Sequence, residues 1–245
     1  MSVGRLLSDT WPAAVYAVGD VHGCLTQLLA LEQAILEDAA DIPGEKWLVM
    51  LGDYIDRGPE SAGVLEHLLQ PPPGGFLRHA LRGNHEQMML DFLDDPLSNL
   101  HWLGQGATAT LASYGVEVAA DALAQSDGLA ALLSQIAQHV PCSHIEFLRG
   151  LPVLLGLPGW VFVHAGMRPG VGLEWQSTED LLWIRDPFLH GPGLAGIRVV
   201  HGHTPTPAPE FTPTRIGIDT GCFVTGRLTG LRITPDGSMR LLAVP

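Results

Sequence analysis

The chain has 245 residues, of which 46% are hydrophobic and 16% are charged. This size and composition suit one compact domain with a large core, and no second domain is required. The formal net charge of −13 argues against a protein that binds a nucleic acid backbone or an anionic membrane surface, because both are negatively charged themselves. Bound divalent cations would offset part of this excess, so some acidic residues are candidate metal ligands.

The three cysteines, Cys24, Cys142 and Cys222, are far apart and odd in number. They form neither a disulfide framework nor the C-x-x-C spacing of a zinc site, so we expect reduced thiols. The N-terminal stretch is interrupted by Ser8 and Pro12 and lacks the apolar segment of a signal peptide. No run approaches the roughly 18 apolar residues of a membrane helix. These features predict a cytoplasmic protein with no membrane partner.

The first quarter of the chain has a strand–helix–strand pattern. Apolar runs and apolar residues at helical spacing predict strands at 15–18 and 47–51 and a helix at 25–36. Each strand ends in Gly-Asp, so Asp20, His22 and Asp53 follow directly after a strand. Loops after parallel strands lie at the same end of a sheet, where α/β proteins bind ligands and metals. We therefore expect these three side chains to converge.

A third strand carries a similar signature at its end. A helix expected at 60–69, stopped by three successive prolines, precedes a strand expected at 76–81. A glycine, Asn84 and His85 follow this strand, and the apolar residues of 88–93 predict the next helix. Three successive strands thus end in glycine followed by a side chain that can bind a metal.

Residues 94–150 differ in character from the segments on either side. Ala, Leu and Gln dominate, the apolar spacing is helical, and clusters of ligand-like side chains are absent. This composition predicts a helical insertion that covers one side of the site and shapes substrate access. Trp102 and Tyr114 are expected to be packing residues, with base stacking as the alternative if the substrate is a nucleotide.

The second half of the chain is expected to be mainly β. Segments 151–157 and 160–163 predict a hairpin whose second strand ends in His164. A capping box at 177–180 predicts a short helix, and Arg185 lies just beyond it. The pattern of strands ending in metal-capable residues therefore continues here.

The last part of the chain supplies a further pair of histidines. A strand expected at 197–200 ends in His201 and His203, separated by one glycine. Apolar runs predict the remaining strands at 215–219, 228–234 and 239–244. A turn is expected at 235–237, between the last two of these strands. Either histidine is placed to join the residues at the other strand ends.

The strand ends together form a candidate metal site, which comprises Asp20, His22, Asp53, Asn84, His164 and one of His201 or His203. Carboxylate oxygens and imidazoles suit Mn, Fe, Zn and similar divalent ions, and the absence of thiolates argues against a soft-metal site. Six ligands are too many for one tetrahedral zinc and suit two ions that share a carboxylate. Asp53 is the natural bridge because its strand is the middle one of three.

Electrostatics indicates the substrate group. Two divalent ions bring four positive charges against two negative ones from Asp20 and Asp53, and the net of about two, 4 minus 2, matches a phosphate monoester dianion. Two such ions can also hold a bridging hydroxide at neutral pH and clamp the oxygens of an in-line displacement. The site therefore predicts hydrolysis of a phosphate ester.

These motifs resemble those of the phosphoprotein phosphatase family of dinuclear metallophosphoesterases. In the family's order, the sequence holds GDVHG (19–23), GDYIDRG (52–58), RGNHE (82–86), HAG (164–166) and GHTP (202–205). The DRG element distinguishes this branch from the wider superfamily of nucleases and phosphodiesterases. Two further stretches are similar to the small bacterial and phage members, namely WIRDPF (183–188) and IDTGCFVTGRLTGLRI (218–233).

The resemblance implies a fold and a ligand set. The fold is α/β with α+β layering: a central β-sandwich flanked by helices, the calcineurin-like metallophosphoesterase fold. It spans 1–245 as a single domain with a helical insertion at about 94–150. One metal takes Asp20, His22 and Asp53, and the other takes Asp53, Asn84, His164 and His203. His201 is then a structural neighbour of the site and not a ligand.

The resemblance also implies roles in catalysis. His85 matches the family's general acid, which protonates the leaving oxygen, and Asp56 matches the partner that fixes its tautomer and orientation. Arg57 matches a phosphate clamp, since a guanidinium can bind two phosphoryl oxygens at once. Arg185 lies outside the tightest motifs and is our own candidate for a second clamp, with a surface helix arginine as the alternative. The two cofactors are divalent ions, with Mn²⁺ expected first and Fe, Zn, Ni, Co or Mg as alternatives.

The leading hypothesis is therefore a metal-dependent phosphohydrolase in which a bridging hydroxide attacks phosphorus directly. The substrate is expected to be a phosphoprotein or a small phosphoester, which makes the chain a serine/threonine or dual-specificity protein phosphatase. The alternative is a symmetrical diadenosine tetraphosphate hydrolase. A binding protein that has lost turnover is a third hypothesis, although no ligand is missing from the motifs. No nucleic acid partner is expected, and regulatory subunits are not implied.

Overall fold

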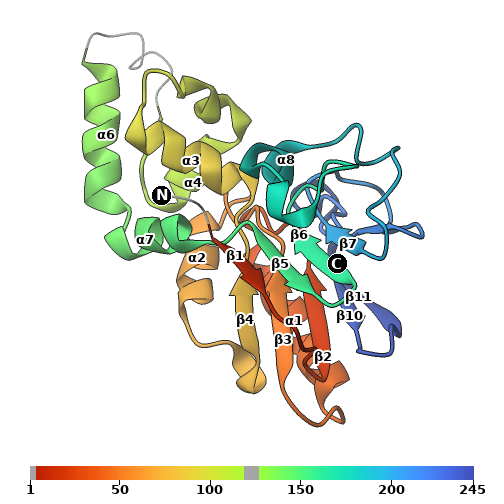
Figure 1. The fold of residues 1–245 in the computed structure, drawn as a ribbon. Coiled ribbons are helices and arrows are strands. Elements are labelled where there is room, and N and C mark those ends of the chain that lie inside the picture. The colour runs from red at the N-terminus through yellow and green to blue at the C-terminus, as the bar shows by residue number, and fades with distance from the viewer. Residues whose placement is uncertain (1–3, 119–126) are drawn as a thin grey trace.

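Two β-sheets packed face to face form the centre of the computed structural model, which describes residues 4–118 and 127–245. Helices cover the outer faces of both sheets, and a separate group of helices lies to one side, at the upper left of Figure 1. This arrangement confirms the predicted β-sandwich flanked by helices. The predicted single domain is not contradicted by any boundary that we describe, and it stays a prediction.

The first sheet has five strands in the order β11-β10-β2-β3-β4. Their bounds are Ala14–Val18 (β2), Lys46–Met50 (β3), Leu77–Ala80 (β4), Leu228–Ile233 (β10) and Met239–Val244 (β11). β2, β3 and β4 are parallel, and β10 pairs antiparallel with both β2 and β11. The predicted strand–helix–strand unit is confirmed, and β3 is the middle of the three strands as expected.

The second sheet has six strands in the order β1-β5-β6-β7-β9-β8. Their bounds are Arg5–Leu7 (β1), Leu154–Leu157 (β5), Trp160–Val163 (β6), Arg198–His201 (β7), Glu210–Phe211 (β8) and Arg215–Gly217 (β9). The predicted hairpin of β5 and β6 is confirmed. The sequence did not predict β1 or β8, because strands of three and two residues are too short to show an alternating pattern.

Helices occupy the connections between strands. The α-helices are Leu25–Ala39 (α1), Ser61–Leu69 (α2), Asn84–Asp94 (α3), Ala107–Ser113 (α4), Gly128–His139 (α6), Cys142–Gly150 (α7), Thr178–Trp183 (α8) and Cys222–Thr225 (α9). Short 3-10 helices lie at Pro73–Gly75 (η1), Leu100–Gln105 (η2) and Leu173–Trp175 (η3). The capping residue predicted for α8 is confirmed, since the Ser177 hydroxyl accepts from the Asp180 N–H.

Alternation along the strands produces three apolar layers, because successive side chains of a strand point to opposite faces. In β2, Tyr16 joins the core beneath α1 and α2, whereas Val15 and Ala17 join the core between the two sheets. In β6, Phe162 faces the inter-sheet core and Val161 faces the core under α8. The central strands of each sheet are thus buried on both faces, which fixes the positions of their ends.

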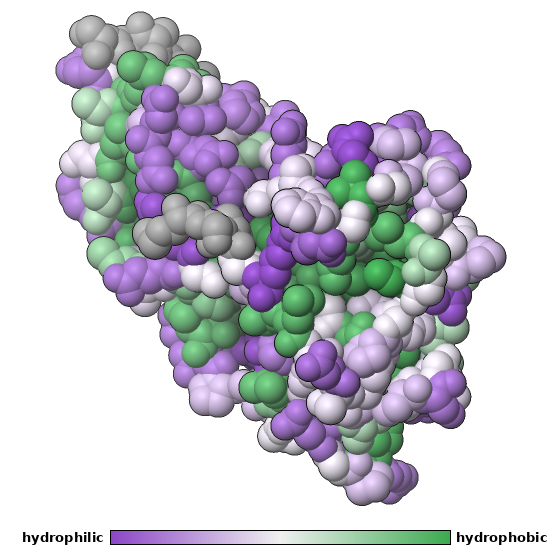
Figure 2. All heavy atoms as spheres, in the orientation of Figure 1, coloured by the Kyte–Doolittle hydropathy of each residue, from purple (hydrophilic) through white to green (hydrophobic). Residues whose placement is uncertain are grey.

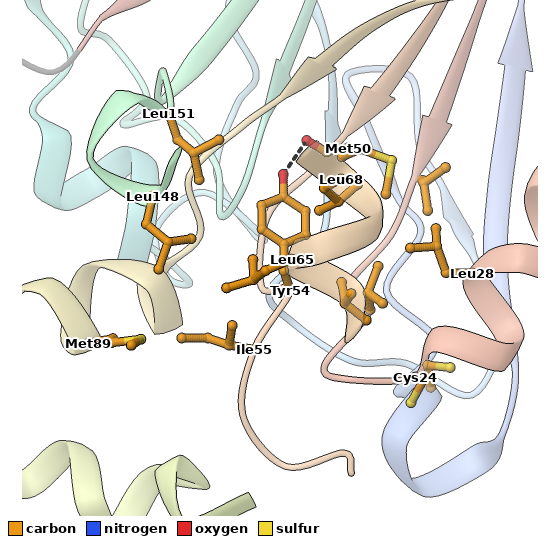
Figure 3. Close-up of a cluster of buried hydrophobic side chains, with 14 of the residues drawn as sticks. Cys24, Leu28, Met50, Tyr54, Ile55, Leu65, Leu68, Met89, Leu148 and Leu151 are labelled. Carbon is orange, nitrogen blue, oxygen red and sulfur yellow. Dashed lines mark hydrogen bonds between the residues drawn. The ribbon is translucent and has the colours of Figure 1, made fainter. Parts of the chain in front are cut away.

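The loop after β3 is anchored in the largest of these cores. Figure 3 shows Tyr54 and Ile55 pointing inward among apolar side chains of the surrounding helices, and Met89 of α3 lies beside Ile55. The Tyr54 hydroxyl donates to the carbonyl of Leu81 at 2.6 Å. Tyr54 and Ile55 therefore anchor the loop in the core, and the buried carboxylates of Asp53 and Asp56 flank this anchor.

The surface and the cysteines add little to the functional assignment. On the face shown in Figure 2, hydrophilic residues cover much of the helical group and hydrophobic residues are more frequent over the strands. All three cysteines are free, as predicted, with Cys24 and Cys222 buried and Cys142 exposed. None of the helices within 4–118 and 127–245 is both long and apolar enough to cross a membrane.

Candidate metal centre and active site

Loops from both sheets meet at one end of the sandwich. In the first sheet, the backbone N–H groups of Val21 and His22 donate to the carbonyl of Asp53 at 3.1 and 2.8 Å. The imidazole of His164, from the second sheet, donates through Nδ1 to the carbonyl of Leu51 at 3.0 Å. The backbone N–H of His203 donates to Asp20 Oδ2 at 2.9 Å. These bonds tie the strand-end loops to one another.

The six side chains predicted as ligands lie together in this region, and all six are buried. Asp53 is shared by two groups that could each hold a cation: one with His22 and His85, the other with His164 and His203. Its Oδ2 lies 3.5 Å from His22 Nε2, and its Oδ1 lies 3.4 Å from His164 Nε2. The two carboxylate oxygens of Asp53 therefore face different groups, which is the geometry expected of a bridging ligand.

Asn84 completes the second group. Its Oδ1 lies 2.8 Å from His164 Nε2 and 2.9 Å from His203 Nδ1. Because Nδ1 of His164 already donates to a carbonyl, the neutral ring leaves Nε2 unprotonated, and this nitrogen faces the oxygens of Asn84 and Asp53. Acceptors that face one another in a buried site require a cation among them.

The titration behaviour of the site also fits a cation. Burial lowers the pKa of His22 to about 3 and that of His203 to about 2, so both rings are neutral and can offer lone pairs. His203 Nε2 and Asp20 Oδ1 are buried and have no hydrogen-bond partner within residues 4–118 and 127–245. Burial raises the pKa of Asp20, with Asp219 and Asp53 adding to the shift. The donor set therefore suits divalent cations.

Glycines next to the ligands allow this close packing. A Cβ atom on Gly83 would lie 2.2 Å from Asp53 Oδ1, and one on Gly202 would lie 1.9 Å from Asp20 Oδ1. Any side chain at either position would displace a carboxylate. Gly83 and Gly202 are therefore required because each lies against a carboxylate of the predicted ligands.

The predicted acid pair lies directly beside the metal-ligand cluster. His85 Nδ1 donates to Asp56 Oδ2 at 2.7 Å, and both side chains are buried. Nε2 of His85 lies 3.9 Å from Asp53 Oδ2 and so faces the metal ligands. Burial alone would lower the pKa of His85, but the charges of Asp53 and Asp56 outweigh it and raise the pKa.

Arg57 and Arg185, the two predicted phosphate clamps, are exposed and lie on different sides of the cluster. Arg57 Nη1 donates to His22 Nε2 at 2.9 Å, and its guanidinium lies 4.8 Å from the ring centroid of Phe223. Arg185 Nη2 is 3.4 Å from the carbonyl of His203. Both cationic groups are thus next to the site and open to solvent.

His201 lies outside both candidate cation groups. It is buried, its Nδ1 lies 3.0 Å from the carbonyl of Gly202, and its ring packs edge-on against Phe188 at 5.0 Å. Burial lowers its pKa to about 4. These contacts support the structural role expected for His201, and His203 is the histidine that joins the cluster.

Sequence reasoning missed the role of Glu86. This buried carboxylate accepts four backbone N–H groups, which belong to Asp53, Tyr54, Ile55 and Gly83, at 2.7 to 3.3 Å. Burial and the charge of Asp53 raise its pKa to about 7 against the effect of these donors. Its position within RGNHE marked it as part of a motif, but only the fold shows that it holds the loop of Asp53.

Sequence reasoning also missed two residues of the helical segment, which comprises the helices of the insertion predicted at about 94–150. Trp102 Nε1 donates to Asp56 Oδ2 at 2.9 Å, and Thr110 Oγ1 donates to Asp56 Oδ1 at 2.7 Å. Trp102 is fully buried, so the packing role expected for it is confirmed and base stacking is excluded. No motif near either residue signalled a contact with Asp56.

Two facing mixed sheets with carboxylate, amide and imidazole groups at their ends define the class of metal-dependent phosphoesterases. The family model for calcineurin-like phosphoesterases matches residues 13–225, and the chain belongs to this family. It is accordingly a phosphoric ester hydrolase that uses divalent metal ions.

Known relatives agree with this assignment. The chain is 32% identical over 236 residues to serine/threonine-protein phosphatase 1 of Salmonella typhimurium, covering 94% of this chain and 95% of the relative. It is 26% identical over 236 residues to an asymmetrical bis(5'-nucleosyl)-tetraphosphatase, PrpE, of Bacillus velezensis. This match covers 88% of this chain and 87% of the relative. The resemblance to phosphoprotein phosphatases expected from the motifs is confirmed.

Solved structures show the same fold at low sequence identity. A structure provisionally called a diadenosine tetraphosphatase has a TM-score of 0.67 at 22% identity and covers 99% of this chain and 98% of its own. A cold-active protein tyrosine phosphatase has a TM-score of 0.59 at 19% identity, and the match covers 97% of this chain and 80% of that protein. At these identities the match supports the fold alone.

Proposed function

We propose that the protein is a phosphoprotein phosphatase that hydrolyses phosphoserine and phosphothreonine, with phosphotyrosine as a second substrate class. The observation that carries this proposal is the His85–Asp56 pair, which lies beside the ligands at a bond length of 2.7 Å. Serine and threonine esters release a poor alkoxide leaving group, which needs a proton donor. A dinucleoside tetraphosphate releases a nucleotide phosphate, which needs that donor much less.

The ligands divide between two cations. Asp20, His22 and Asp53 would hold one ion, and Asp53 with Asn84, His164 and His203 would hold the other. When bound, two divalent ions lower the pKa of water and offset the charge of the phosphoryl oxygens. Manganese is the metal that we propose, because oxygen and imidazole donors suit it, and Fe, Zn, Ni, Co or Mg would fit the same donors.

The remaining residues handle the substrate. Arg57 and Arg185 would bind phosphoryl oxygens from two sides, where a guanidinium can donate two parallel hydrogen bonds. His85 would give the proton on Nε2 to the leaving oxygen, and Asp56 would keep Nδ1 as the donor to its own carboxylate. The substrates are then a phosphoprotein or a small phosphoester, and no regulatory subunit is needed for the chemistry.

The substrate class can be tested by a direct comparison. The manganese-loaded protein is assayed for phosphate release from phosphoserine, phosphothreonine and phosphotyrosine peptides and for cleavage of diadenosine tetraphosphate. We expect kcat/KM on the peptides to exceed that on the dinucleotide. A reversed order would reject the proposal.

Hydrolysis of dinucleoside tetraphosphates is the second candidate, and the similarity to PrpE favours it. The products would identify the cleavage mode. Symmetrical cleavage, which the sequence motifs suggested as the alternative, yields two molecules of ADP. Asymmetrical cleavage, the mode in the name of that relative, yields ATP and AMP. Chromatography of the products distinguishes these cases.

A further inference from the structure

The Asp56 carboxylate accepts hydrogen bonds from more than His85. Trp102 donates to the same oxygen as His85, Oδ2, at 2.9 Å, and Thr110 donates to Oδ1 at 2.7 Å. The donors come from η2 and α4, 46 and 54 residues further along the chain. None of the four side chains is more than 1% exposed. Both oxygens of the carboxylate are therefore fixed by groups of the helical segment.

The chemistry of these donors determines where the protons are. An indole N–H can only donate, so Oδ2 of Asp56 acts as an acceptor. The proton between Asp56 and His85 then lies on Nδ1 of the ring. This arrangement leaves Nε2 of His85 to face the metal ligands. Trp102 thus helps to set both the tautomer and the orientation of the residue proposed to donate a proton.

The same helical segment supports the backbone at Asp56 and Arg57. These residues have φ values of 70° and 71°, a region that L-residues rarely adopt. Thr110 Oγ1 accepts from the Asp56 N–H at 2.8 Å, and the carbonyl of Gly106 accepts from the Arg57 N–H at 3.2 Å. A Cβ atom on Gly106 would lie 2.7 Å from the Arg57 nitrogen, so this contact requires glycine.

From these contacts we infer that Trp102 and Thr110 are positioning residues for proton donation by His85. The inference rests on the proposed phosphatase function and assigns the helical segment a part in the chemistry beyond substrate access. The contribution of Trp102 and Thr110 to the rate must depend on the leaving group of the substrate. An alkyl phosphate needs the proton from His85 on its leaving alkoxide, whereas p-nitrophenyl phosphate releases the stable p-nitrophenolate anion without it.

Two variants remove hydrogen bonds to Asp56 with little change of shape: Trp102→Phe removes one, and Thr110→Val removes two, to Oδ1 and from the backbone N–H. Trp102→Phe keeps an aromatic ring but removes the N–H, and Thr110→Val keeps the branched shape but removes the hydroxyl. We expect each to lower kcat/KM on a phosphoserine peptide about tenfold, as for loss of a hydrogen bond to a charged group. On p-nitrophenyl phosphate we expect a loss below about threefold, since the acid contributes little there. Thr110→Ser keeps the hydroxyl and should have the wild-type ratio of kcat/KM on the phosphoserine peptide to kcat/KM on p-nitrophenyl phosphate.

A matched control separates positioning from general destabilisation. Leu132→Ala alters a buried residue of α6 within the same core, and the leucine side chain has no polar atom that could bond to Asp56 or His85. This control should lower the melting temperature without changing the substrate ratio. Metal content is measured for every variant by elemental analysis, and it should match the wild type.

Two results would overturn the inference. Equal losses on both substrates in Trp102→Phe and Thr110→Val would indicate a merely structural role, and unchanged rates on both would indicate none. Failure of the proposed function is recognised separately, from the wild type alone. A wild-type protein that is metal-loaded but hydrolyses neither phosphate monoester would reject that function and this inference together.

Discussion

The loops of the candidate site and the turns elsewhere in the molecule reverse the chain in different ways. In the described ranges, every non-glycine residue with positive φ belongs to the site: His22, Asp53, Asp56, Arg57 and His203. Elsewhere the same backbone region is occupied by glycine, as at Gly159 of the β5–β6 hairpin and Gly237 of the β10–β11 hairpin. Functional side chains thus occupy positions where glycine would be less strained.

This difference shows how the site is kept in place. A non-glycine residue at positive φ costs on the order of 1–3 kcal/mol and persists only where its surroundings determine the conformation. At the site those surroundings are present, since Glu86 binds the backbone at Asp53 and Thr110 binds it at Asp56. The site loops are therefore pre-organised by buried hydrogen bonds, whereas the Gly237 turn combines glycine with exposed hydrogen bonds to the carboxylate of Asp236.

The largest expected effect follows from removing the shared carboxylate. Asp53→Asn should lose metal and lower turnover by roughly 10³-fold or more, because the stabilisation that metal ions provide amounts to several kcal/mol. Elemental analysis and a phosphatase assay measure both changes. Asp95→Asn, which removes an equal charge from an exposed position after α3, serves as the control. Two tightly held ions in Asp53→Asn would refute the bridging role.

The acid pair should show a smaller effect that spares the metals. His85→Asn should keep both ions and lose roughly 10²–10⁴-fold in turnover of alkyl phosphates, the usual contribution of a general acid. Steady-state kinetics with a phosphoserine peptide, alongside metal analysis, tests this expectation. Unchanged kinetics would remove His85 from the mechanism.

The support of the strained loop can be weakened without touching a ligand. Glu86→Gln replaces a carboxylate that accepts four N–H groups by an amide that itself carries N–H donors. We expect the free energy of unfolding to fall by about 2 kcal/mol, measured by urea denaturation. Exposed Glu146→Gln is the control and should change it by less than about 0.5 kcal/mol. Equal effects in both variants would deny Glu86 its supporting role.

A turn remote from the site should show the smallest effect. Gly237 has a φ of 81° and open space around it, so Gly237→Ala adds backbone strain without a steric clash. The expected cost is about 1 kcal/mol of stability with no change in kcat/KM. Gly150→Ala, at the end of α7 with ordinary φ and equally open space, should not be destabilising. A loss of activity in Gly237→Ala would erase the distinction between the two kinds of turn.

The sequence was sufficient for the parts of the site that are local. Strand ends followed by glycine and a polar residue identified Asp20, Asp53 and Asn84, because apolar runs are easily recognised and parallel strands bring their ends together. The contacts of Trp102 and Thr110 with Asp56 could not be found in this way. They join residues 46 and 54 positions apart, and nothing in the local pattern of either partner specifies the other.

Backbone conformation was likewise out of reach of the sequence. Positive φ is usually inferred from glycine, so the conformations of His22 and His203 had no signal. The strand β1 was missed because three residues show no periodicity, and its pairing with β5 depends on a partner about 150 residues away in the chain. Tertiary contacts decided each of these features.

The central claim is that Asp53 bridges two cations held by groups from both sheets. Titration of the metal-free protein with Mn²⁺, followed by electron paramagnetic resonance, tests it most directly. We predict that two ions bind per chain and give the spectrum of a spin-coupled pair. A single bound ion, or two ions whose spectra remain uncoupled, would contradict the account.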